Sequence, residues 1–158
     1  MAETYDRAEQ YTATNSLGYL LRRAHKLTMQ VGEESFSDED LSFTQWVALI
    51  QLRDGLVDTC GALARCLGHD GGATTRMLDQ LEERGLIARQ RSTSDRRVIH
   101  LSLTPVGRDA ANRLVPRVAG LWDMLMEAFT PEEDAMLLSL LRRLIDRLSA
   151  VQSGEARP

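Results

Sequence analysis

The sequence predicts a mainly α-helical protein with one small β-hairpin. Apolar residues recur at helical spacing along most of its 158 residues, and four segments begin with a Ser or Thr suited to capping a helix. One short stretch near residue 100 alternates apolar and polar side chains, as a strand with a single buried face does. The length fits one domain of ordinary size, or one compact unit with helical extensions.

The first two helices lie on either side of an acidic loop. An apolar stripe predicts a helix over residues 17–31 that ends at Gly32. Residues 33–40 then contain five acids and no base. Ser42 and Gln45 have the spacing of a capping box, so we expect the second helix to begin there and to run to about residue 55.

Two short helices joined by a glycine-containing turn come next. Thr59 can cap the first, which we expect to end at Gly68. The second should run from about Gly72 to Arg84 and stop at Gly85. The residues of this second helix that recur at helical spacing should pack inward: Thr74, Met77, Leu78 and Leu81.

A β-hairpin is predicted over residues 86–90 and 98–103. Its tip, residues 91–97, has no apolar side chain to bury and should project into solvent. Two helices, a turn and a hairpin in this order are typical of a winged helix-turn-helix. In that arrangement one helix lies in the DNA major groove and a loop contacts the neighbouring backbone or minor groove. Duplex DNA is therefore the expected partner.

Two further helices should follow the hairpin, each starting with a threonine cap and a proline. The first begins at Thr104 and carries an apolar stripe to Phe129, with a kink rather than a break at Pro116. The last begins at Thr130 and carries a heptad seam about two heptads long. One small winged helix cannot bury all these stripes, so we expect a second copy of the chain to cover them. The residues expected to dimerise are Leu17, Leu137, Leu141, Leu144 and Leu148.

The charges are unevenly distributed along the chain. The formal net charge of -4 argues against indiscriminate coating of nucleic acid. Residues 84–97, however, contain five arginines and one acid, which places positive charge on the hairpin. No apolar run is long enough to span a membrane and no signal-peptide pattern is present, so we expect a cytoplasmic protein without a membrane partner.

Side chains on the exposed face of the fourth helix suit contacts with bases and phosphates. Arg76 and Gln80 suit guanine and adenine edges, and Thr75 suits a phosphate or a thymine methyl group. Glycines at the start of this helix let the backbone approach a phosphate. At the hairpin tip, Asp95 can brace an arginine while another guanidinium reaches a groove or the phosphates. The predicted DNA contacts are Gly71, Gly72, Ala73, Thr75, Arg76, Gln80, Arg91, Ser94, Asp95, Arg96 and Arg97.

Enzymatic and metal sites are not expected. His69 and Asp70 lie beside glycines, but adjacent residues do not face each other as a catalytic dyad must, and no G-x-S-x-G motif exists. The three histidines are scattered and show no spacing suited to a metal. We therefore predict no catalytic residue, no metal and no cofactor.

The motifs between residues 41 and 107 resemble the MarR family of bacterial transcriptional regulators. They are Leu63-Ala64, Leu67-Gly68, Thr75-Arg76, Leu78-Asp79, Leu81-Glu82, Gly85-Leu86-Ile87, Asp95-Arg96-Arg97, and Leu101-Ser102-Leu103-Thr104 with Gly107. The resemblance implies a homodimer whose winged helices bind a palindromic operator. It also implies release of the DNA by a small ligand, often phenolic or an aromatic carboxylate. Gly71 and Gly72 depart from the family, which more often has polar side chains at that point.

These inferences lead to one MarR-like unit over residues 1–158. Residues 41–104 form the DNA-binding part, and residues 13–32 and 105–152 form the dimerisation helices. A polar cluster on otherwise apolar helices suggests an effector site near Arg22, His25 and Trp46. The sequence and the resemblance together predict a ligand-released repressor. The alternatives are a winged helix that binds protein, and a redox-responsive regulator using Cys60, whose pKa a helix N-terminus can lower.

Overall fold

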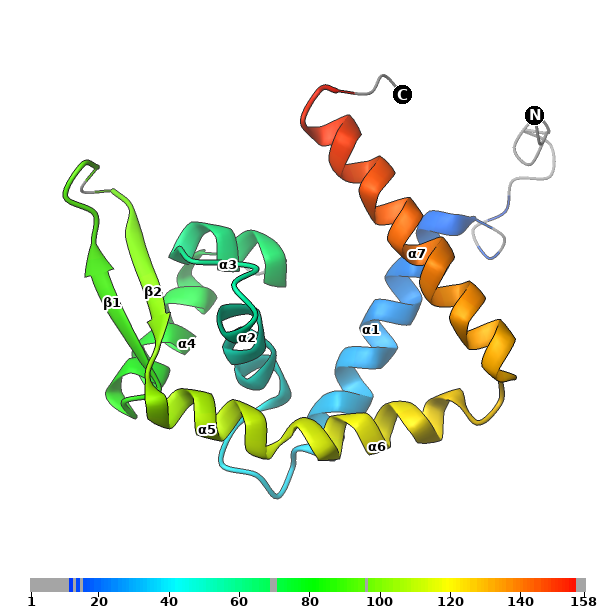
Figure 1. Ribbon diagram of the computed structural model, residues 1–158, viewed down its shortest axis with the longest axis horizontal. Coiled ribbons are helices and arrows are strands. Elements are labelled where there is room, and N and C mark those ends of the chain that lie inside the picture. The colour runs from blue at the N-terminus through cyan, green and yellow to red at the C-terminus, as the bar shows by residue number, and fades with distance from the viewer. Residues whose placement is uncertain (1–11, 13, 15, 69–70, 96, 156–158) are drawn as a thin grey trace. The chain divides into compact units, whose positions relative to one another are not determined.

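The computed structural model describes residues 12, 14, 16–68, 71–95 and 97–155 (Figure 1). The chain divides into two compact units, with the boundary after Pro116. The described residues are mostly helical, with one two-stranded antiparallel sheet. This confirms the predicted fold class. No helix among the described residues is long and apolar enough to cross a bilayer.

Helix α1 (Leu17–Ser35) is longer than the sequence predicted. Its N-cap is Ser16, whose hydroxyl accepts a hydrogen bond from the backbone N–H of Tyr19 at 3.2 Å. The prediction that Gly32 ends this helix is wrong, because the helix continues through that residue. Gly32 is buried, and a Cβ atom there would overlap the ring of Phe43. The glycine therefore permits close packing of α1 against α2 and does not terminate the helix.

The next three helices begin and end close to the predicted residues. They are α2 (Phe43–Arg53), α3 (Cys60–Leu67) and α4 (Gly71–Glu83). The capping box between Ser42 and Gln45 is present, and Thr59 caps α3. Gly68 ends α3 in the left-handed conformation with φ 64°, which few other residues adopt without strain.

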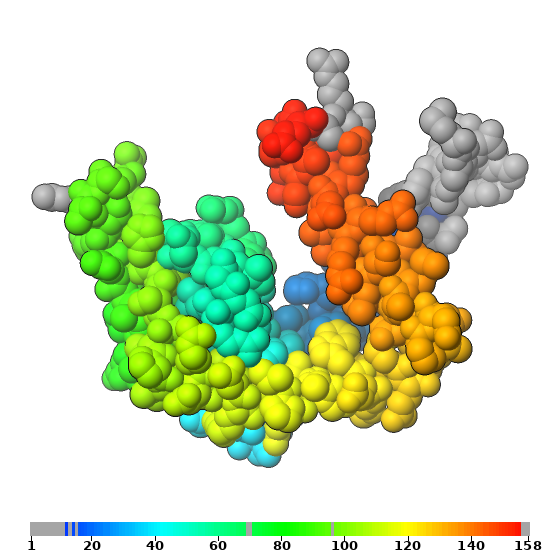
Figure 2. Space-filling view, viewed as in Figure 1, coloured from blue at the N-terminus to red at the C-terminus, as the bar shows by residue number. Residues whose placement is uncertain are grey.

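The hairpin consists of β1 (Ile87–Arg91) and β2 (Ile99–Leu103), paired with Ile87 opposite Leu103. The alternation is as predicted, with Leu101 buried and both His100 and Ser102 exposed. The hairpin is anchored to the loop before α3, because the N–H of Leu101 donates to the carbonyl of Asp58 at 2.8 Å. In the space-filling view the hairpin projects at the left as a narrow column (Figure 2).

The segment after the hairpin contains two helices where the sequence predicted one kinked helix. Helix α5 (Pro105–Arg113) ends before Leu114, and α6 (Val115–Met126) begins after it. Pro116 has no N–H to donate to the carbonyl of Asn112, so the helical hydrogen bonding cannot continue through this point. Pro116 instead occupies the first turn of α6, where a missing N–H costs nothing.

Helix α5 belongs with the winged helix and not with the helices that follow. It packs against α2, and it buries Gly107 and Ala111. The boundary between the two units falls within residues 105–152, the predicted dimerisation segment, so α6 and α7 (Pro131–Gln152) lie mainly beyond Pro116. Helix α7 has the predicted cap at Thr130 with its capping box to Glu133.

The core of the first unit contains mainly leucines and three aromatic rings. Phe36, Phe43 and Trp46 form the aromatic cluster, with ring centroids 5.4 to 6.0 Å apart. The largest side chains that are fully buried are Leu41, Leu49, Leu63, Leu78, Leu81 and Leu114. These residues come from the loop before α2, from α2, α3 and α4, and from the α5–α6 junction. The core therefore fixes α4 against the rest of the unit.

Candidate nucleic-acid interface

Helix α4 has one buried face and one exposed polar face, as predicted. Thr74, Met77, Leu78 and Leu81 are buried. Gly71, Gly72, Thr75, Arg76, Asp79 and Gln80 are exposed, and Ala73 is half-buried. The hydroxyl of Thr75 donates to the carbonyl of Gly71 at 2.7 Å, so this side chain is partly engaged within its own helix. A row of polar side chains on a firmly packed helix can enter a major groove.

Arg89 on β1 is a brace between the hairpin and α4. Its guanidinium lies 2.7 Å from the carboxylate of Asp79 and 3.5 Å from that of Glu82, and its side chain is only 18% exposed. Pairing and partial burial make Arg89 unsuitable as a DNA contact. Of the five arginines in residues 84–97, Arg89 therefore compensates acids on α4 that lie outside that segment.

The hairpin tip is held by hydrogen bonds among its own residues. One carboxylate oxygen of Asp95 accepts from the backbone N–H of Arg97 at 2.9 Å and lies 3.4 Å from its Nε atom. The hydroxyl of Ser92 accepts from the backbone N–H groups of Ser94 and Asp95, each at 3.3 Å. The Arg97 side chain remains 92% exposed, and Arg91 and Ser94 are exposed as well. Arg96, also a predicted contact, lies outside the described residues.

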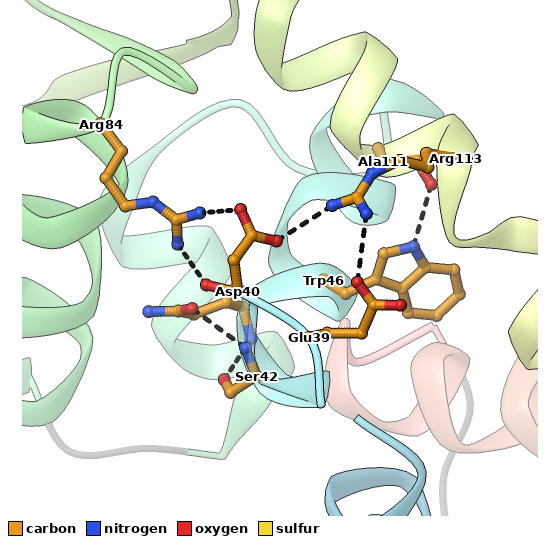
Figure 3. A network of polar contacts seen from close by, with 8 residues as sticks. Glu39, Asp40, Ser42, Trp46, Arg84, Ala111 and Arg113 are labelled. Carbon is orange, nitrogen blue, oxygen red and sulfur yellow. Dashed lines mark hydrogen bonds and ion pairs between the residues drawn. The ribbon is translucent and has the colours of Figure 1, made fainter. Parts of the chain in front are cut away.

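A network of ion pairs at the acidic loop was not foreseen from the sequence (Figure 3). Asp40 lies between two arginines: Arg84 donates to its carbonyl and to its carboxylate at 2.8 Å each, and Arg113 donates to the carboxylate at 2.9 Å. Arg113 also donates to Glu39 at 3.1 Å. The loop therefore joins the residue after α4 to the end of α5. The run of acids in residues 33–40 was the only sequence signal for this contact.

The start of α2 is fixed by α1 and the body of α2 by α5. The carboxylate of Glu33 accepts from the backbone N–H groups of Phe43 and Thr44 at 3.0 and 2.9 Å, and from the Thr44 hydroxyl at 2.6 Å. The indole N–H of Trp46 donates to the carbonyl of Ala111 at 3.0 Å (Figure 3). That carbonyl lies in the last turn of α5, where helical partners are missing.

Among the described residues, two hollows each contain one of the three predicted effector residues. Trp46 is 8% exposed within the aromatic cluster, with its N–H group engaged as described above. His25 lines a hollow of about 530 Å³ between α1, the start of α2 and the end of α3. Arg22 lines another hollow, of about 290 Å³, which shares Gln30 with the first, and its guanidinium carbon lies 5.9 Å from the centroid of the Tyr19 ring.

The pKa of the Cys60 thiol is raised and not lowered. The helix N-terminus on which the redox alternative depended has a smaller effect than burial, which raises this pKa against an opposing effect of Arg89. Among the described residues, no group of three or more His, Cys, Asp or Glu side chains could hold a metal ion. His69 and Asp70 lie outside the described residues.

Comparison with known proteins gives consistent matches. Residues 41–99 match the model of the MarR family. The transcriptional repressor NicR of Pseudomonas putida is 26% identical over 86% of each chain. The structure of BpsR of Bordetella bronchiseptica, described as regulated in its DNA binding by 6-hydroxynicotinic acid, aligns with a TM-score of 0.68 and 26% identity over 86% of this chain and 97% of that one. A mutant MarR of Escherichia coli bound to operator DNA aligns with a TM-score of 0.66 and 29% identity over 81% and 92%.

Proposed function

The chain belongs to the MarR family of DNA-binding transcriptional regulators, and we propose that it represses transcription as a homodimer bound to a palindromic operator. Residues 41–104 are the DNA-binding part, and α1, α6 and α7 supply the dimer contacts. Repression is supported by the name of the relative NicR. The observation that carries the proposal is the exposed polar face of α4 beside a projecting hairpin whose Arg97 is 92% exposed.

Helix α4 is the element that enters the major groove. Arg76 is exposed in its middle and suits bidentate contact with guanine. Gly71, Gly72 and Ala73 at its start leave room and backbone N–H groups for a phosphate. At the hairpin tip, Arg91, Ser94, Asp95, Arg96 and Arg97 contact the adjacent backbone or minor groove. Arg97 makes the direct contact there, and Asp95 holds it.

The homodimer is supported by apolar side chains that a single chain leaves exposed. Helix α7 has no buried residue along its length. Leu17, Leu137 and Leu148 are exposed, and Leu141 and Leu144 are half-buried. A second copy related by a twofold axis would cover these residues. Such a dimer places two recognition helices about 34–36 Å apart, which is one turn of DNA.

An anionic aromatic effector is supported by the hollow that contains Arg22. Three cations, Arg22, Arg23 and Lys26, line it together with the ring of Tyr19. A carboxylate can pair with the guanidinium groups while an aromatic ring stacks on the tyrosine. We therefore retain Arg22 as an effector residue and place His25 in a separate hollow. 6-Hydroxynicotinate is a suitable probe: it should weaken DNA binding by the unmodified protein and have less effect on Arg22→Ala.

The test of DNA binding is fluorescence anisotropy with duplex DNA from the region flanking the gene and with scrambled DNA, at two salt concentrations. Tight binding to the native DNA alone, weakening as salt rises, is the expected result. Arg76→Ala should weaken specific binding by about 1–3 kcal/mol and relax one base position. Arg97→Ala should weaken binding to all sequences. The matched control is Lys26→Ala on α1, which also removes one positive charge but lies outside the proposed DNA contacts. Unchanged binding by both arginine variants would refute the proposed surface.

A further inference from the structure

Two glutamines connect the start of α2 to the polar face of α4. The side-chain oxygen of Gln45 accepts the backbone N–H of Ser42 at 3.1 Å. The side-chain NH₂ group of Gln45 then donates to the side-chain oxygen of Gln80 at 3.0 Å. Both glutamines and Ser42 line a shallow hollow of about 370 Å³ between the two helices, together with Arg76. A bond therefore runs from a helix cap to a residue that faces DNA in the proposed function.

The first bond fixes the direction of the second. A backbone N–H can only donate, so the amide end of Gln45 that faces Ser42 must be the oxygen. The NH₂ end of Gln45 is then directed to Gln80 and requires an acceptor, so Gln80 must turn its own oxygen toward α2. The cap is held from the other side as well, because the backbone N–H of Gln45 donates to the Ser42 hydroxyl at 3.1 Å.

We propose that Gln45 is a positioning residue that makes Gln80 present its NH₂ group to DNA, so that Gln80 selects a keto base, guanine or thymine. This inference rests on the proposed function, in which α4 lies in the major groove. The major-groove edges of guanine (O6 and N7) and thymine (O4) only accept hydrogen bonds, cytosine N4 only donates, and adenine accepts at N7 but carries the N6 donor beside it. An unconstrained glutamine would instead use both amide ends on adenine. The link to Gln45 opposes that mode because it turns the oxygen of Gln80 toward α2.

Gln45→Glu reverses the proposed orientation while it keeps the cap. Glutamate is as suitable as glutamine at this position of a capping box. Its carboxylate can only accept, so Gln80 must donate its NH₂ group toward α2 and turn its oxygen outward. The preferred base at the contacted position should then change from keto to amino, that is, from guanine or thymine to adenine or cytosine.

The experiment is selection of binding sites by the full-length protein from a random duplex library, followed by sequencing and by affinity measurements on single-base variants. The unmodified protein should prefer a keto base over cytosine by about fivefold to tenfold at one position of each half-site, as expected for one hydrogen bond, and over adenine by less, because adenine N7 can accept one. Gln45→Glu should reverse this preference. Gln45→Met, which removes the link without adding charge, should reduce the preference toward none.

Two further variants identify the cause of any change. Gln90→Glu places the same negative charge on the exposed part of β1 and should weaken binding to all sequences without altering base preference. Gln80→Ala should remove discrimination at the same position. The inference is overturned if both Gln45 variants keep the original preference, or if Gln80→Ala leaves the base profile unchanged while specific binding persists. Absence of any sequence-specific binding by the unmodified protein would instead refute the proposed function.

Discussion

Replacing Gly32 with alanine tests whether close approach, and not helix termination, explains this residue. Gly32 lies within α1 and is buried against the ring of Phe43. An alanine Cβ would overlap that ring, and its distance to the ring Cγ atom would be only 2.6 Å. The ring cannot move aside freely, because Phe43 is 5% exposed and packs against Phe36 and Trp46 with centroids 5.4 and 5.8 Å away.

Two opposing contributions determine the size of the effect. Alanine is favoured over glycine inside a helix by about 1 kcal/mol. Overpacking a rigid core usually costs about 1–3 kcal/mol, and expelling a buried phenylalanine costs about 3–5 kcal/mol. The steric cost exceeds the gain in helix propensity because the overlap involves an enclosed aromatic ring. We therefore expect Gly32→Ala to lower the free energy of unfolding by about 2–3 kcal/mol.

The measurement is chemical and thermal unfolding at fixed protein concentration, since the proposed dimerisation would add to the apparent stability. A loss of this size should lower Tm by roughly 5–10 °C for a chain of this length. Gly61→Ala in α3 is the matched control, because it lies outside the proposed dimer helices and an added Cβ there meets only the end of the Arg65 side chain, at an ordinary contact distance of 3.6 Å. It should be neutral or stabilising. A stability of Gly32→Ala equal to that of the control would refute the packing explanation.

Three other changes test single contacts. Trp46→Phe removes the N–H group that donates to the carbonyl of Ala111 and should lower the free energy of unfolding in urea by about 1–3 kcal/mol. An unchanged free energy of unfolding would show that this hydrogen bond does not stabilise the fold. Asp40→Asn breaks exposed ion pairs and should lower the free energy of unfolding by about 1 kcal/mol at low salt and by less at high salt. A decrease that does not depend on salt would contradict an ionic contribution. Because burial raises the pKa of Cys60, the fraction of this thiol present as thiolate at neutral pH is reduced. Iodoacetamide should therefore modify Cys60 more slowly than the exposed Cys66, and the rate at Cys60 should increase with pH. Equal rates at the two cysteines, measured by mass spectrometry, would contradict this.

Local signals in the sequence predicted the elements well. Ser42, Thr59, Thr104 and Thr130 each cap the helix that was expected to follow them. Caps and strand alternation depend on residues within a few positions of one another, so a single sequence contains the necessary information. The buried and exposed faces of α4 were predicted for the same reason.

The errors arose where the decisive partner is distant in the sequence. Gly32 was interpreted as a helix end because its contact, Phe43, lies beyond the acidic loop. The pairing of Arg89 was not predicted because Asp79 and Glu82 meet it only after the hairpin folds back on α4. The raised pKa of Cys60 likewise follows from burial in the folded protein and not from its position in the helix. Tertiary contacts of this kind leave no periodic signal.

The orientation of α4 depends on side chains from three other parts of the winged helix. Arg89 of β1 pairs with Asp79, Gln45 of α2 binds Gln80, and Asp40 of the acidic loop binds Arg84. Exposed pairs contribute little stability individually, but pairs on separate elements restrict rotation and translation of the helix together. Two of these partners, Gln45 and Asp40, lie next to the start of α2, which Glu33 of α1 fixes through its carboxylate. A displacement of α1 would therefore reach the exposed polar face of α4 through the start of α2, even if the apolar core of the winged helix did not change.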